Sequence, residues 1–362
     1  MIKATNPSSG FKIIYLIPFV LLALLLGMNG GLLRLGWEFP LSATAASHGL
    51  LMTGSFMGTL ITLERISTMP NTGWRIFPLS GAISALFFAL GWFHAGLAAL
   101  LFANAGLLLF YFKQMGQHKE LYWYLLLAGS LCWLIGTLLV WKTLFIPRAV
   151  GWWMAFLLFT IVGERLELTR FLPVPQKAFY ALALFFGLVL LSLFLPFHEG
   201  GRWLLGLAVI GIGLWLSRYD MARITVKKTG YYRYIGTALY AGYGWLIALG
   251  LVLFSMEDSA FFYDVFVHAF FLGFAFSMIW AHAPLIFPSL IKKQGPAYHP
   301  IIWFGWSLFQ ITLLARLLSA LLGASTLRQW FGMTNGLSIF LLFASIAWYY
   351  SVSPKPSSAK SN

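Results

Sequence analysis

The chain has 362 residues, of which 60% are hydrophobic, 18% aromatic and only 9% charged. Soluble proteins carry about 25% charged residues, so this composition indicates a protein embedded in a lipid bilayer. At about 20 residues per membrane helix, the length accommodates about twelve spans and excludes a sizeable soluble domain. Soluble catalysis, secretion and nucleic-acid binding are therefore excluded. Cys132 is the single cysteine, which excludes an internal disulfide, a zinc finger or a thiolate cluster.

Continuous apolar runs, separated by polar or Pro- and Gly-containing breaks, predict an all-α membrane helix bundle of about twelve spans in one domain, residues 1–350. The runs are 13–36, 42–63, 76–93, 95–112, 121–141, 149–167, 177–196, 203–217, 234–254, 262–290, 299–322 and 331–350. The first run is interpreted as a retained span and not a signal peptide. Residues 351–362, rich in Ser, Pro and Lys, are expected to form a disordered cytoplasmic tail.

The loops between these runs differ in their content of Lys and Arg. With a cytoplasmic N-terminus, eighteen of these residues fall on the inner side and five on the outer side. This asymmetry predicts both termini inside and a multi-pass protein of the cell inner (cytoplasmic) membrane. The most basic loop, 218–233, contributes part of the net charge of +14. It is interpreted as a topology anchor that contacts anionic lipid.

Three histidines lie inside predicted spans, where ionisable side chains are costly and therefore functional candidates. They are His48, His268 and His282; the other four histidines lie in or beside loops and are interpreted as interfacial. Counting from the outer ends of their spans places His48 and His268 at one level, roughly 10 Å below the outer face. Two imidazoles at one depth on different helices can take the opposite axial positions of a heme iron. The alternative is two structural histidines hydrogen-bonded to backbone carbonyls.

The residues around these histidines resemble a known family. The run Ser47-His48-Gly49-Leu50-Leu51-Met52 is similar to the second helix of heme–copper oxidase subunit I, whose HGxxM or HAxxM pattern carries a low-spin heme ligand. The stretch 27–40, glycine-rich and ending in Arg34, Glu38 and Pro40, is similar to that family's first helix. His268 matches the second histidine of the His-x-His pair in its tenth helix. The resemblance implies that His48 and His268 ligate one b-type heme.

The departures from that family are equally informative. Phe266 stands where the first histidine of the pair would hold the high-spin heme, and the sixth and seventh spans lack the family's copper-site histidines. The resemblance therefore argues against a terminal oxidase or a nitric-oxide reductase acting on its own. It is closer to the smaller NnrS type of twelve-span heme-containing membrane proteins, which are linked to nitric-oxide and nitrosative-stress responses.

A second, deeper layer consists of Glu64, Glu164 and His282, about 21–24 Å below the outer face. Each glutamate precedes an arginine, in Glu64-Arg65 and Glu164-Arg165. Neighbouring residues on a helix point about 100° apart, so each glutamate is expected to pair with an arginine of another helix. One interpretation is an interhelical ion-pair cluster; the other is an inner site for a proton, a metal or a quinone headgroup.

Arg316 is a further charge inside a predicted span, and helix rise returns it to roughly the level of His48 and His268. A heme propionate at that level would need a cation, and Arg34 and Arg328 at the outer rim are further candidates. The alternative for Arg316 is snorkelling or bonding to free carbonyls.

Two functional classes follow from these residues. The first is a heme protein in electron transfer, with a redox partner or a quinone, or in the nitric-oxide response. The second is a transporter or copper permease that uses the same histidines, with Met52, Met57 and Met278 as added soft ligands and copper as the bound metal.

Overall fold

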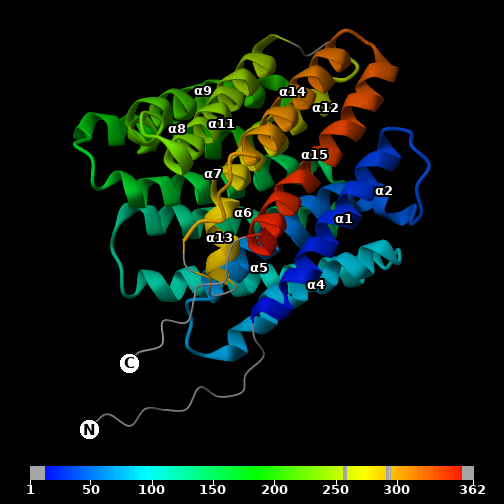
Figure 1. Ribbon diagram of the computed structural model, residues 1–362, viewed down its shortest axis with the longest axis horizontal. Helices are drawn as coiled ribbons and strands as arrows, with labels where there is room; N and C mark the ends of the chain where they lie inside the picture. The colour runs from blue at the N-terminus through cyan, green and yellow to red at the C-terminus, as the bar shows by residue number, and fades with distance from the viewer. Residues whose placement is uncertain (1–12, 256–258, 291–292, 294, 353–362) are drawn as a thin grey trace. The chain divides into compact units, whose positions relative to one another are not determined.

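The computed structural model describes residues 13–255, 259–290, 293 and 295–352, and within these ranges every regular element is a helix. The chain divides into two compact units, Met1–Glu167 and Leu168–Asn362. Figure 1 colours the helices along the chain, from blue at the N-terminus to red at the C-terminus. The predicted tail falls almost entirely on residues 353–362, which lie outside the described residues.

The first unit is built from α1 to α7, with a π-helix, η2, inside one run. Its elements are η1 (Ile13–Tyr15), α1 (Ile17–Arg34), α2 (Ala43–Leu50), η2 (Leu51–Gly58), α3 (Thr59–Ile66), η3 (Thr72–Arg75), α4 (Ile76–Ala89), α5 (Phe93–Met115), α6 (Leu121–Thr143) and α7 (Pro147–Thr169), which ends just past the unit's boundary. Packing joins α4 to α5, α5 to α6, and α1 to both α2 and η2.

The core of the first unit combines stacked aromatic rings with hydrogen bonds between helices. The ring of Trp133 on α6 stacks on Phe156 on α7, with centroids 4.9 Å apart and planes 7° from parallel. The buried amide of Asn104 donates to the Thr137 hydroxyl at 2.8 Å and to the Trp133 carbonyl at 3.2 Å. Such interhelical hydrogen bonds contribute about 0.6 kcal/mol each in membrane proteins, so packing carries most of the stability.

The second unit contains the remaining helices and the second π-helix. Its elements are α8 (Gln176–Phe194), η4 (Phe197–Glu199), α9 (Gly201–Tyr219), α10 (Ala222–Thr225), α11 (Gly230–Ser255), α12 (Phe262–His268), η5 (Ala269–Phe276), α13 (Ser277–Leu290), α14 (Ile302–Leu321) and α15 (Ser325–Val352). A polar chain links three of these helices: Trp245 on α11 donates to Gln310 on α14 at 2.7 Å, and Gln310 donates to Ser277 on α13 at 2.9 Å.

Both π-helices are eight residues long, and all eight residues of each are buried. A π-helix widens the backbone, and such segments are frequent at functional sites. Glycine permits close packing against this wide backbone. A Cβ atom at Gly273 in η5 would lie 2.6 Å from the Trp245 ring, and one at Gly58 in η2 would lie 2.2 Å from the Trp133 ring. Large aromatic side chains therefore close directly onto both π-helices.

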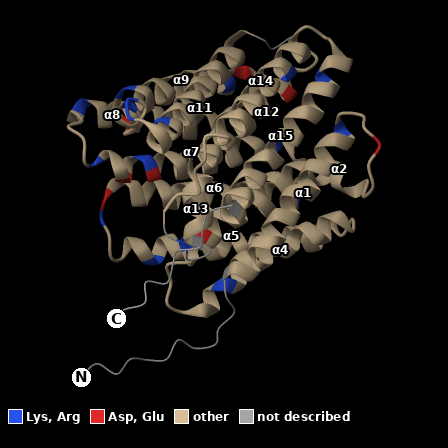
Figure 2. Cartoon of the chain, viewed as in Figure 1, with Lys and Arg blue, Asp and Glu red and all other residues tan. Residues whose placement is uncertain are grey.

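In the described part of the chain, nine helices are long and apolar enough to cross a membrane. Each predicted run overlaps one of these helices or another helical segment. The three runs that do not coincide with one of the nine correspond to the α2–η2–α3 segment, to α4 and to α9. Figure 2 shows Lys, Arg, Asp and Glu gathered near helix ends, with long uncharged stretches between them. The protein is therefore a helical membrane protein.

Candidate functional site

His48 stands in the last turn of α2, directly before η2, and is held against α1. Its Nδ1 lies 2.7 Å from the Gly27 carbonyl oxygen. A carbonyl accepts only, so Nδ1 carries a proton, and in the neutral ring the lone pair is on Nε2. The ring lies on α1 at Gly31, where a Cβ atom would come within 2.9 Å of the His48 Cε1. The glycine-rich end of α1 therefore creates the space in which this imidazole is fixed.

His268 is the last residue of α12, directly before η5, and is held from its own helix. Its Nδ1 lies 2.8 Å from the backbone carbonyl oxygen of Asp264 and 2.9 Å from the Asp264 Oδ1. Both oxygens accept a hydrogen bond from Nδ1–H, so in the neutral ring the lone pair is on Nε2. A carboxylate on the far nitrogen also makes the imidazole a stronger donor to a metal ion.

Asp264 is the centre of a charged cluster in the second unit. The Arg316 Nη2 on α14 lies 3.1 Å from its Oδ1, and the Arg328 Nη1 on α15 lies 3.2 Å from its Oδ2. The three side chains are only 20%, 8% and 16% exposed for Asp264, Arg316 and Arg328. One carboxylate therefore pairs with two guanidinium groups at a site largely removed from solvent, which ties α12 to α14 and α15.

Arg316 also contacts the ring of His268. Its Nη2 lies 3.3 Å from Nε2 and 3.4 Å from Nδ1 of the imidazole. A nitrogen in the ring plane at two such nearly equal distances would collide with Cε1, so the guanidinium nitrogen lies over the face of the ring. The lone pair of Nε2 points outward in the plane of the ring, and Arg316 does not lie along it.

The residues predicted for the inner layer are distributed between the two units. Glu164 on α7 forms an ion pair with Arg65 on α3, as helix geometry requires for adjacent Glu and Arg residues, and Glu64 lies near this pair. His282, on α13 in the second unit, has Nδ1 2.8 Å from the Met278 carbonyl oxygen one turn earlier. Glu164 thus belongs to an interhelical ion pair with Arg65.

The three arginines predicted to face heme propionates are Arg34, Arg316 and Arg328. Arg34 ends α1 and is exposed. Arg316 and Arg328, expected opposite heme propionates, have the protein carboxylate of Asp264 as their partner. Asp264 itself was missed by the sequence reasoning because it lies only three positions into the predicted span, at the depth of a rim residue. Its position four residues before His268, one helical turn away, is the signal that would have found it.

Within the described residues, no three or more His, Cys, Asp or Glu side chains are grouped so that they could hold a metal ion. Three imidazoles have Nδ1 against a backbone carbonyl oxygen: His48 in the first unit, and His268 and His282 in the second.

The fold and these sites define a helical membrane protein with a half-buried histidine in its second unit that contacts a carboxylate. The chain matches, over residues 12–351, the family described as Domain of unknown function (DUF8744), and it belongs to that family. No curated protein and no solved structure matches the chain.

Proposed function

We propose that this protein is an integral membrane heme protein in which His48 and His268 are axial ligands of a b-type heme. The proposal is supported by two features together: the hydrogen bond that fixes each imidazole and the equal depth predicted for the two rings, which His282 does not share although it has the same kind of hydrogen bond. In His48 and in His268, Nδ1 lies within 2.8 Å of a backbone carbonyl oxygen, so Nε2 of the neutral ring would be the atom that binds iron. This arrangement is the usual support of a metal-binding histidine.

Imidazole nitrogen atoms are suitable ligands for a heme iron. Heme supplies a reversible one-electron change at iron, and bis-imidazole ligation keeps that iron low-spin and favours electron transfer over oxygen activation. The protein's own contribution is to fix the rings and to set the charge around them. Asp264 orients His268 by accepting a hydrogen bond from its Nδ1–H, while Arg316 and Arg328 pair with the Asp264 carboxylate. Arg34 stays our candidate to face a propionate.

We further propose twelve spans with both termini in the cytoplasm of a cell with an inner membrane. The α2–η2–α3 segment, α4 and α9 would add three spans to the nine helices found by length and composition in the described residues. The excess of Lys and Arg in alternate loops supports this orientation. The physiological role in this proposal is electron transfer with a redox partner or a quinone, or a response to nitric oxide.

The experiment is a reduced-minus-oxidised absorption spectrum of the purified protein, expressed with ample heme and kept in detergent. We expect about one heme per chain with a low-spin bis-imidazole spectrum. We expect poor binding of carbon monoxide to the reduced protein, because both axial positions are filled. A chain without a Soret band overturns the proposal. Copper bound stoichiometrically in its place would support the permease.

A further inference from the structure

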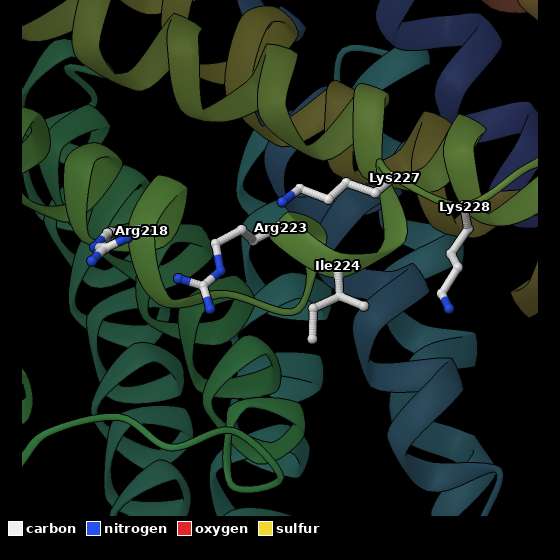
Figure 3. A pocket seen from close by; sticks show the side chains of 5 residues that line it. All are labelled: Arg218, Arg223, Ile224, Lys227 and Lys228. Atoms are coloured by element: carbon white, nitrogen blue, oxygen red, sulfur yellow. The ribbon is translucent and has the colours of Figure 1, made fainter.

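The connection between α9 and α11 forms a basic pocket that plays no part in the proposed heme function. The pocket has a volume of about 440 Å³ and is lined by Arg218, Arg223, Ile224, Lys227 and Lys228. Figure 3 shows Arg223, Ile224 and Lys227 in the centre, with Arg218 and Lys228 on either side. Four cations of one short segment therefore surround one cavity.

These cations are available to a ligand. All four of their side chains are exposed, and no ion pair joins any of them to a carboxylate among residues 13–255, 259–290, 293 and 295–352. The acidic residue of the same segment, Asp220, is buried. Its Oδ1 accepts hydrogen bonds from the Ala222 amide at 2.8 Å and from the Tyr243 hydroxyl at 3.0 Å. Asp220 therefore shapes the turn, and the pocket keeps its positive charge.

The position of the pocket indicates the source of the anion. It lies directly before α11, one of the helices long and apolar enough to cross a membrane, so it stands where a span meets the headgroup layer. Ile224, 38% exposed, adds an apolar side chain to the same lining. A lipid presents a phosphate together with an apolar glycerol and acyl region. An inorganic phosphate ion has no apolar atoms that could contact the exposed isoleucine.

We propose that this pocket binds the headgroup of an anionic phospholipid that ends in a phosphomonoester. A terminal phosphate carries up to two negative charges and three acceptor oxygens, so it suits two guanidinium and two ammonium groups better than a phosphodiester with a single charge does. The lipid then serves as a specific ligand of the α9–α11 connection.

The test uses the full-length protein in neutral detergent with mixed micelles that contain dioleoyl phosphatidic acid, phosphatidylglycerol or phosphatidylcholine. Bound lipid is counted by native mass spectrometry, and affinity is measured by thermal stabilisation. We expect phosphatidic acid to bind most tightly. Lys227→Gln/Lys228→Gln is expected to weaken that binding roughly thirtyfold, since each cation near a membrane anion contributes about 1 kcal/mol.

The matched control is Lys113→Gln/Lys119→Gln, which removes two lysines near the α5–α6 connection and should leave phosphatidic acid binding unchanged. Equal weakening by the two double variants, or none by the pocket variant, overturns the proposal. If the pocket variant does not fold, Arg223→Gln takes its place, with a loss of roughly fivefold expected. Inorganic phosphate forms the last arm: stabilisation by phosphate equal to that by phosphatidic acid overturns the lipid as the ligand.

Discussion

In the first unit, His48 stands in the last turn of α2 and η2 follows it; in the second unit, His268 ends α12 and η5 follows it. Both π-helices are fully buried. The support of the rings differs, however. His48 is held through a neutral carbonyl of α1, and His268 through a carboxylate that two arginines contact. One imidazole is thus fixed by close helix packing and the other by charge, and the two should respond to different substitutions.

The largest effect is expected from removing either ring. His48→Ala and His268→Ala should each lose the heme or convert it to a high-spin form, because each removes one axial bond to iron. Absorption spectra and heme content per chain measure the result. His94→Ala, at the start of α5, is the control and should keep the wild-type spectrum. Wild-type spectra in both site variants would end the proposal for these residues.

The charge-based support is tested by Asp264→Asn. The substitution leaves Arg316 and Arg328 without the carboxylate that pairs with them, and breaking a buried ion pair in this way costs about 3 to 5 kcal/mol. Thermal unfolding in detergent should show a strongly destabilised protein. Asp264→Asn/Arg316→Leu removes one charge of each sign and should recover part of the loss. A single variant as stable as the wild type would show that the cluster contributes nothing to stability.

The packing-based support is tested by Gly31→Ala. The added Cβ atom would meet the His48 Cε1 at 2.9 Å and Nδ1 at 3.3 Å, so the ring must move away from the Gly27 carbonyl. Overpacking of this kind costs about 1 to 3 kcal/mol, and we expect a weakened heme spectrum as well. Gly187→Ala on α8 is the control, since a Cβ atom there has nothing within 4 Å. Equal outcomes for the two alanines would remove Gly31 from the site.

Charge near His268 should also set the heme potential, in opposite directions for the two partners. Asp264→Asn weakens the electron-donating imidazole and removes a negative charge, so the midpoint potential should rise. Arg316→Leu removes a cation that disfavours ferric iron, so the potential should fall, by an amount on the order of tens of millivolts. Redox titration of each variant measures both shifts. Shifts of the same sign would mean that structural disturbance, not charge, governs the potential.

The sequence predicted the positions of the helices well because apolar runs and their polar breaks are dictated by the bilayer. The break predicted at His94, between the runs 76–93 and 95–112, is a few residues late: α4 ends at Ala89 and α5 begins at Phe93. The π-helices could not be predicted, since every residue of η2 and η5 is buried and no periodicity distinguishes the faces. Depth counting found His48, His268 and Arg316 but gave no partner for them. The role of Asp264 depends on α14 and α15, which are remote in sequence.

The smallest effect on the heme is expected from His282→Ala. His282 lies fourteen residues after His268, about 21 Å along a helix, which is too far to ligate the same iron. Its Nδ1 is bonded to the Met278 carbonyl one turn earlier, a contact within its own helix. The heme spectrum and content should therefore match the wild type, while stability falls slightly. Loss of heme in His282→Ala with retention in His268→Ala would overturn the depth argument and the alignment of this helix with the family it resembles. Both would fail together because each assigns the ligand to the first of the two histidines.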